Sequence, residues 1–260
     1  MITLKSAKEI EVMAHAGAIV AGTLSLMREI LRPGMTTEDL DVAAESFIRS
    51  HDGATPSFKG LYGFPKTLCT SIDKEIVHGI PSPKRVLNEG SLVSVDVGVQ
   101  FEGLHADSAT TLAVGRITPE AERLLKVTQE CLAAGIAQAR VGNHVGDIGH
   151  AVQTVAEGAG YGVVRELVGH GIGTRFHEEP QVPNYGSPKR GPRLLQGMTL
   201  AIEPMITVGS PATRTLADKW TVVTADGTLS AHFEHTVAIT ANGPRILTAN
   251  LRQVAEGRHT

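Results

Sequence analysis

Two histidines lie at the ends of a glycine-rich stretch, GHGIGTRFHEEP, at residues 169–180, and either imidazole could bind a metal ion or a substrate. A helix would place His170 and His177 on one face, two turns apart. The three alternating glycines and the closing proline disfavour a helix, since each glycine costs about 1 kcal/mol relative to alanine. We therefore predict an extended or tightly turned backbone that passes close to whatever the histidines contact.

Four carboxylates occur in or beside apolar segments that the pattern predicts to be buried strands: Asp96, Asp107, Glu203 and Glu234. Burying an unpaired carboxylate is expensive, and no lysine or arginine is close enough in sequence to be an evident partner. A multivalent cation would compensate all four charges, with His170 as a neutral fifth ligand. Such a set can hold two divalent ions if two carboxylates bridge them, about 3.5–4 Å apart, and the ions would then share a hydroxide nucleophile.

Each of these residues also has an ordinary structural interpretation. A single aspartate or histidine in a strand is more often a hydrogen-bonded residue than a metal ligand. The same expectation applies to His78, His105, His232 and His235. Glu203 could end a strand and Glu234 could pair with Lys219, whereas Glu178 and Glu179 are expected to be solvated or to lie beside the site. The metal interpretation is favoured because the four acids fall at equivalent points of an internal repeat.

Helical and strand patterns alternate in the same order twice along the chain. Apolar spacing predicts helices at residues 6–31 and at about 37–51, followed by β-rich runs at 92–99 and 109–114 with a hairpin turn at 101–103. The second half predicts helices at 119–140 and 145–158 and then strands to about residue 248.

The repeat is also visible in individual residues. Arg32-Pro33-Gly34 corresponds to Arg140-Val141-Gly142 at an offset of 108 (140 − 32), and the tripeptide at 105–107 resembles the one at 232–234. We therefore predict an α+β fold in which a pseudo-twofold pair of halves shares one central antiparallel sheet covered by helices. The chain would be a single catalytic domain, 1–260, with halves at about 1–116 and 117–250, a surface loop at 187–192 and a loose tail at 251–260.

Composition excludes several classes of protein. The 260 residues are 42% apolar and 20% charged, with a net charge of −3, which gives no basic footprint for nucleic acid or an anionic membrane. Two cysteines form no disulfide framework, and no secretory signal precedes the first helix, so we expect a cytoplasmic protein.

Over nearly its whole length the chain resembles the type I methionine aminopeptidases, an M24-like family of dimetal enzymes. The resemblance implies their pita-bread fold, which is also called the creatinase/aminopeptidase fold. The motifs that carry the resemblance are Pro65-Lys66 through Cys69, Ser71-Ile72, Val77-His78-Gly79-Ile80-Pro81, Ser94-Val95-Asp96-Val97-Gly98, His105-Ala106-Asp107-Ser108-Ala109, Gly169-His170-Gly171-Ile172-Gly173 with His177-Glu178-Glu179-Pro180, Ala201-Ile202-Glu203-Pro204 and Phe233-Glu234-His235-Thr236.

The resemblance implies a role for each site residue. Asp96, Asp107, His170, Glu203 and Glu234 would hold two divalent metal ions (Co, Mn, Fe or Zn), with Asp107 and Glu234 bridging. His78 and His177 would hydrogen-bond the substrate, and Glu203 is our candidate for the proton shuttle. The methionine pocket would be formed by Tyr62, Phe64, Cys69, Phe176 and Trp220. Leu61, Phe64 and Leu167 depart from the residues usual in the family, which affects the shape of the pocket.

The implied activity is metal-dependent removal of the N-terminal methionine from nascent polypeptides with a small second residue, by a monomer with a transient contact to the ribosome. A proline-specific peptidase of the same superfamily, a binding module that has lost its ligands and a structural metal site are the alternatives. The sequence does not identify the physiological metal.

Overall fold

The computed structural model describes residues 2–249, and its elements repeat a helix pair followed by strands. The first half contains α1 (Ala7–Ile30), α2 (Thr37–Arg49), β1 (Ala54–Pro56), the 3₁₀ turn η1 (Leu61–Gly63), β2 (Leu68–Ile72), β3 (Glu75–Val77), β4 (Leu92–Phe101) and β5 (Leu104–Ala113). The second half contains α3 (Pro119–Gln138), α4 (Val145–Gly158), β6 (Gly162–Val163), β7 (Gly169–Gly171), β8 (Glu178–Val182), β9 (Thr199–Ile202), β10 (Met205–Thr207), β11 (Thr213–Thr215), β12 (Val222–Thr224), β13 (Ser230–His232), β14 (His235–Thr240) and β15 (Gly243–Ile246). The predicted order of elements is confirmed. The assignment of the whole chain to one domain stays a prediction, and the predicted tail at 251–260 lies outside the described residues.

The two helices of each pair are connected by the same kind of turn. Gly34 and Gly142 both have a positive φ, 89° and 95°, a conformation that glycine adopts without strain. After each turn, an aspartate carboxylate accepts a 2.7 Å hydrogen bond from the backbone N–H three residues earlier, Asp39 in one half and Asp147 in the other. The repeat seen in sequence therefore reflects repeated helix caps.

A long hairpin, β4–β5, forms the centre of the first half. Its two-residue turn, Glu102-Gly103, has φ values of 46° and 78°, as a type I′ turn requires, and pairs Phe101 with Leu104. The predicted hairpin turn at 101–103 is confirmed.

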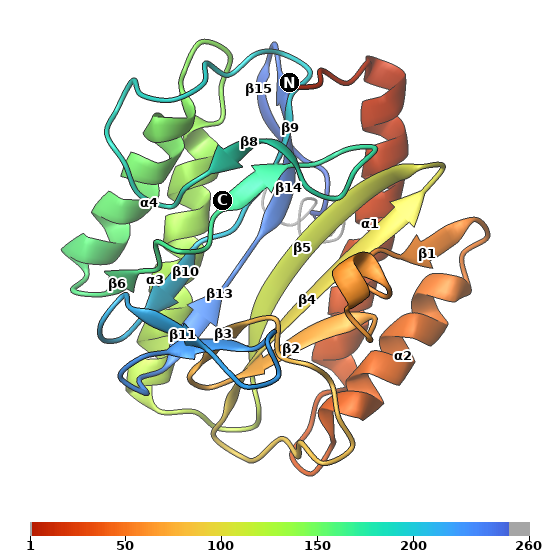
Figure 1. Cartoon of the computed structure of the whole chain (residues 1–260), viewed down its shortest axis with the longest axis vertical. Coiled ribbons are helices and arrows are strands. Elements are labelled where there is room, and N and C mark those ends of the chain that lie inside the picture. Colours follow the sequence, from red (N-terminus) through yellow and green to blue (C-terminus); the bar gives the residue numbers. More distant parts are fainter. Residues whose placement is uncertain (1, 250–260) are drawn as a thin grey trace, which may run out of the picture.

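The central layer consists of two antiparallel sheets. In one sheet, β4 pairs with β5 along one edge and with β2 and β1, one after the other, along its other edge; the second sheet has the order β15-β14-β9-β7-β8. They meet where β5 and β14 lie side by side, with α1 and α2 on one side of the molecule and α3 and α4 on the other (Figure 1). At this seam the Thr236 hydroxyl joins the backbone of Asp107 by hydrogen bonds of 2.8 and 2.9 Å, and the Glu234 N–H donates to the Ala109 carbonyl at 3.0 Å. The α+β antiparallel fold is confirmed, with its central layer divided at the seam between the halves.

Each helix pair covers the strands of its own half with an apolar core. In the first half, Val20 and Leu40 pack with Val95 and Val97. In the second half, residues of α3 and α4 pack with those of β9 and β14. The strand faces turned away from the helices are free to carry polar side chains.

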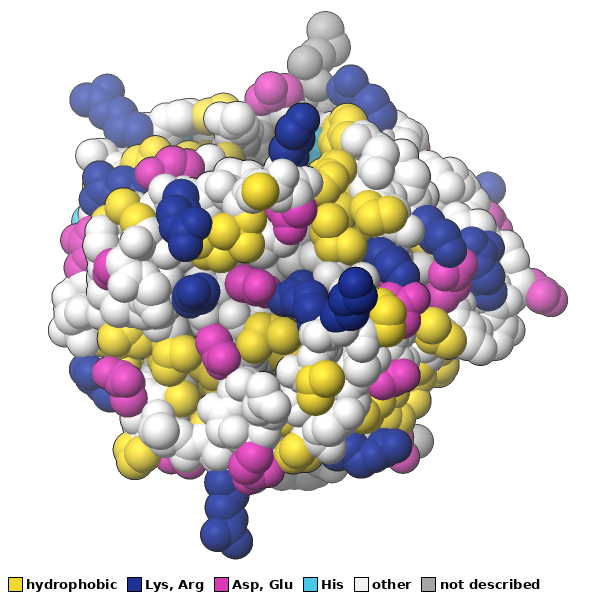
Figure 2. Space-filling view, turned by 60° about the horizontal axis from the view of Figure 1, so that its bottom comes forward, with side chains coloured by type: hydrophobic (Ala, Val, Ile, Leu, Met, Phe, Trp, Pro, Cys, Tyr) yellow, Lys and Arg dark blue, Asp and Glu magenta, His cyan; other side chains and the backbone are white. Residues whose placement is uncertain are grey.

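Helix α1 has the length and composition of a membrane span, with a mean hydropathy of 1.5 over its most apolar window, although half of that window is buried within the protein. It packs against β4 and β5 as a core helix. On the face shown in Figure 2, lysine and arginine side chains alternate with acidic ones, so no patch of a single charge covers that face.

Candidate metal centre and substrate pocket

The β4–β5 hairpin places two acids close together. Asp96 pairs with Ala109 across the hairpin and Asp107 pairs with Gly98, so the two carboxylates lie diagonally on neighbouring strands. Asp96 has Cys69 of β2 as its cross-strand partner on the other side. Both acids are buried, 9% and 4% exposed.

The second half contributes its residues from three chain segments. His170 lies on β7 opposite Ala201 of β9, Glu203 directly follows β9, and Glu234 lies between β13 and β14. His170 Nε2 is 3.7 Å from Glu203 Oε1. Potential ligand atoms of Asp107, His170 and Glu234 all lie within 4.8 Å of one another. The seam between the two sheets thus gathers acids that are separated by up to 138 positions (234 − 96).

The electrostatics of this cluster are unfavourable without a cation. Burial raises the pKa of each of the four carboxyl groups well above its ordinary value, and the neighbouring carboxylates raise it further. One oxygen each of Asp96, Asp107 and Glu234 is buried without a hydrogen-bond partner, and none of the four acids forms an ion pair with a lysine or arginine of residues 2–249. Orphaned carboxylate oxygens of this kind suit divalent cations, so the donor set fits the predicted metals.

His170 has the protonation state and the orientation that a neutral metal ligand needs. Burial lowers its pKa to about 3, and its Nδ1 lies 2.8 Å from the Gly171 carbonyl. With the single proton donated at Nδ1, Nε2 keeps a lone pair directed toward the acids.

The two other predicted histidines lie beside the same cavity. Burial lowers the pKa of His78 to about 4 and also lowers the pKa of His177, so both imidazoles are neutral at pH 7. The ring of His177 stacks on Tyr62 at 5.7 Å and lies 4.4 Å from the ring of His170. His78 has a φ of 61°, and such strained non-glycine residues concentrate at functional sites.

An apolar cavity of about 220 Å³ opens directly onto the acids. All five residues predicted for the methionine pocket line it, together with Phe58, Leu61, Val77, His78, Asp96, Asp107, Leu167, Val168, His170, His177, Glu203, Met205 and Glu234. Phe64 contacts Trp220 edge-on at 5.1 Å, and Phe58 contacts Phe176 at 5.3 Å. This volume is below the range of about 300–1,000 Å³ typical of drug-sized ligands, so the cavity suits a single side chain.

The pocket includes residues that were not predicted. Burial raises the pKa of the Cys69 thiol well above its ordinary value, and the nearby carboxylates raise it further, which favours the neutral thiol as part of the wall. Phe58, Val77 and Met205 were not predicted to line the pocket, because their neighbours in sequence give no signal beyond ordinary core. His232 was also not assigned a role, yet its Nε2 lies 3.8 Å from Glu203 Oε2.

Glu178 and Glu179 were expected to be solvated or to lie beside the site, and each alternative holds for one of them. Glu178 lies beside the site with its side chain buried and paired with Lys5, whereas Glu179 is exposed. Within residues 2–249, no ion pair joins Glu234 to Lys219.

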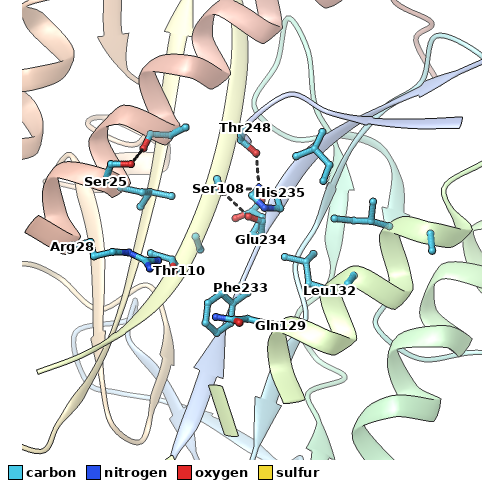
Figure 3. Close-up of a pocket in the computed structure, with 17 residues that line it drawn as sticks. Ser25, Arg28, Ser108, Thr110, Gln129, Leu132, Phe233, Glu234, His235 and Thr248 are labelled. Atoms are coloured by element: carbon cyan, nitrogen blue, oxygen red, sulfur yellow. Dashed lines mark hydrogen bonds between the residues drawn. The ribbon is translucent and has the colours of Figure 1, made fainter. Parts of the chain in front are cut away.

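A larger cavity, of about 830 Å³, lies between α1 and α3 (Figure 3). Ser108 donates a hydrogen bond to the Glu234 carbonyl there, and His235 Nδ1 lies 2.8 Å from the Thr248 hydroxyl. Of the clustered acids only Glu234 lines it, and neither His170 nor His177 does. The smaller cavity is therefore the candidate site, because within residues 2–249 it is the one lined by the acids together with His170 and His177.

A buried acid cluster at the seam of two repeated α+β halves, open to a small pocket, defines the class as a metallopeptidase of the pita-bread fold. The model of metallopeptidase family M24 matches residues 11–241. The chain belongs to this family, and its similarity is to the methionine aminopeptidases within it.

The relatives are similar over almost their full length. The methionine aminopeptidase of Clostridium acetobutylicum is 53% identical over 95% of this chain and 99% of its own. Methionine aminopeptidase 1 of Bacillus subtilis is 50% identical with the same coverage. The crystal structure of methionine aminopeptidase from Thermotoga maritima has a TM-score of 0.94 at 43% identity, covering 95% of this chain and 99% of that one.

A prolidase from Pyrococcus furiosus shares the fold, with a TM-score of 0.76, but only 22% of the sequence, and this chain covers 65% of its length. That likeness concerns the fold alone.

Proposed function

We propose that this enzyme removes the N-terminal methionine from polypeptides whose second residue is small. The observation that carries the proposal is the convergence of Asp96, Asp107, His170, Glu203 and Glu234 on the wall of an apolar pocket sized for one side chain. The relatives at about 50% identity support the same activity.

Five residues would hold two divalent metal ions: Asp96, Asp107, His170, Glu203 and Glu234, with Asp107 and Glu234 shared between the ions. When bound, the ions would supply Lewis acidity at the scissile carbonyl and would lower the pKa of a water for its attack on that carbonyl. Oxygen ligands with one imidazole accept manganese, iron, cobalt or zinc.

The side chains of the pocket would select and orient the substrate. Phe64, Phe176 and Trp220 present ring edges and faces to the methionine thioether, contacts worth about 0.3–1.5 kcal/mol each. The acids that line the pocket would favour a substrate that brings a free amine to them, which would limit cleavage to chain ends. The limit to a small second residue is carried over from the resemblance to the methionine aminopeptidases.

The neutral histidines would act on the peptide bond. A neutral imidazole carries one N–H donor, so His177 can donate to the carbonyl oxygen as negative charge develops there. His78 would hydrogen-bond the backbone of the second residue. Glu203 would take a proton at its carboxylate and pass it to the leaving amine.

The activity is tested by the release of free methionine from Met-Ala-Ser. Metal-stripped protein would be assayed with Mn²⁺, Co²⁺, Fe²⁺ or Zn²⁺ added back, alongside Ala-Pro-Ala as the substrate of a proline-specific enzyme. The Glu203→Gln variant should lose activity, whereas Glu130→Gln, which removes an exposed carboxylate in α3, should keep it. Cleavage of Ala-Pro-Ala alone would move the chain to the proline-specific branch, and no cleavage with any metal would favour a binding module.

We further propose that the enzyme is a cytoplasmic monomer that contacts the ribosome transiently. Sedimentation of the purified protein would test the monomer. Co-sedimentation with translating ribosomes at low and physiological salt would test the contact.

A further inference from the structure

A buried ion pair lies next to His177 in the turn between β7 and β8. Lys5 Nζ is 2.5 Å from Glu178 Oε2, and the two side chains are 3% and 2% exposed. Glu178 directly follows His177, whereas Lys5 precedes the first helix. The pair therefore joins the N-terminal segment to the pocket across 173 positions.

Glu178 also closes the turn between β7 and β8. Its other oxygen, Oε1, accepts hydrogen bonds from the Arg175 N–H at 3.1 Å and from the Thr174 hydroxyl at 3.3 Å. The backbone of the turn is held from the other side, because the His105 N–H donates to the Gly173 carbonyl at 2.9 Å. Phe176 and His177 extend from this closed turn into the pocket.

Lys5 is itself fixed in place. Its backbone N–H donates to the Gly197 carbonyl at 2.7 Å, and its Nζ also donates to the Thr3 carbonyl at 3.3 Å. The side chain runs so close to the turn that a Cβ atom on Gly173 would lie 2.2 Å from Lys5 Cε. Neither partner can move without displacing the backbone beside it.

We propose that Lys5 and Glu178 form a positioning pair through which the N-terminal segment fixes the turn that presents Phe176 and His177 to the substrate. The inference rests on the proposed function, since it assigns the pair an effect on peptide cleavage through His177. Neither residue touches the pocket, so both act through the turn. A misplacement of about 1 Å at a reacting group can reduce a rate on the order of 10²-fold.

The test compares Lys5→Met and Glu178→Gln with two controls in the metal-loaded full chain. Lys8→Met removes an exposed lysine from the same end of the chain, and Val152→Ala lowers stability from within the core of α4. The readouts are kcat/KM on Met-Ala-Ser at 25 °C, bound metal per chain, and amide hydrogen exchange of residues 173–178.

We expect kcat/KM to fall by about tenfold to a hundredfold in both pair variants, with faster exchange of 173–178 and unchanged metal content. Lys8→Met should stay within about twofold of the parent protein. The pair variants are compared with Val152→Ala at an equal loss of Tm. The proposal is overturned if they then show the same kcat/KM and the same hydrogen exchange of residues 173–178 as Val152→Ala. In that case the pair would contribute stability alone. If the parent protein releases no methionine with any metal, the proposed function fails, and the exchange of 173–178 still decides whether the pair holds the turn.

Discussion

Replacing Asp107 by asparagine should stabilise the metal-free protein at pH 8 while abolishing its response to metal. Potential ligand atoms of Asp107 and Glu234 lie within 4.8 Å of each other. Two unit charges at that separation repel by about 3 kcal/mol at an effective dielectric constant of about 20. The variant removes this repulsion.

The sign and the pH window follow from the raised pKa of Asp107, which burial and the charge of Glu234 cause. Between its unfolded and folded pKa values the folded state binds the extra proton, so stability is lost as pH rises. The loss is about 1.4 kcal/mol per pH unit above the unfolded pKa of about 3.9, hence about 0.8 kcal/mol at pH 4.5. By pH 8 this loss of stability approaches about 3 kcal/mol, the repulsion between the two charged carboxylates.

The assay is urea unfolding in EDTA at pH 4.5 and at pH 8, with Asp52→Asn, at an exposed site, as the matched control. The buried amide brings its own penalty of about 1–3 kcal/mol, which is the same at both pH values. We compare each variant with the parent protein by the difference in their free energies of unfolding. For Asp107→Asn this difference should be about 2 kcal/mol more stabilising at pH 8 than at pH 4.5. For the control it should be the same at both pH values. A difference below about 0.5 kcal/mol, or one of opposite sign, would refute the reasoning.

Addition of metal provides the second half of the test. A divalent ion at a hundred times its Kd should stabilise the parent protein by about 2.7 kcal/mol, which raises Tm by about 5–11 °C at the usual 2–4 °C per kcal/mol. Asp107→Asn should show no shift at that concentration, and an equal shift in both proteins would place the metal elsewhere.

Three further predictions concern the pocket and the backbone beside it. Phe176→Ala should lower the free energy of unfolding by about 3–5 kcal/mol and raise KM for Met-Ala-Ser, since the ring is buried and lines the cavity; urea unfolding and steady-state kinetics check this. Gly79→Ala should destabilise the protein by about 1–3 kcal/mol in the same unfolding assay, because its Cβ would lie 2.1 Å from the Thr70 carbonyl oxygen; an unchanged midpoint would contradict that clash. Tyr62→Phe removes the hydroxyl that lies 3.3 Å from His177 Nδ1 and should reduce kcat/KM about fivefold, the equivalent of about 1 kcal/mol, with Tm unchanged.

Local order was predictable because it depends on neighbours in the chain. The helix caps, the Glu102-Gly103 turn and the apolar spacing of α1 to α4 all act within a few residues, so their signals survive in the sequence. The four acids were also recognisable, since a carboxylate inside an apolar strand pattern is expensive without a partner.

Other features could not be predicted because their causes are distant in sequence. The sequence left open whether Glu178 is solvated or lies beside the site, and only the folded chain brings Lys5 against it. The pocket positions of Phe58 and Met205 depend on the way in which the two halves pack, as does the approach of His232 to Glu203. Nothing local distinguishes these residues from ordinary core.

The sequence by itself determined which residues could carry the chemistry, because residue type and strand pattern suffice to identify acids that need a cation. Tertiary structure alone decided that these acids meet. The seam between β5 and β14 is made by side-chain and backbone hydrogen bonds around Thr236, between segments more than a hundred residues apart. Burial at that seam then sets the pKa values of the acids and histidines, since desolvation depends on the atoms packed around a group and not on its neighbours in the chain.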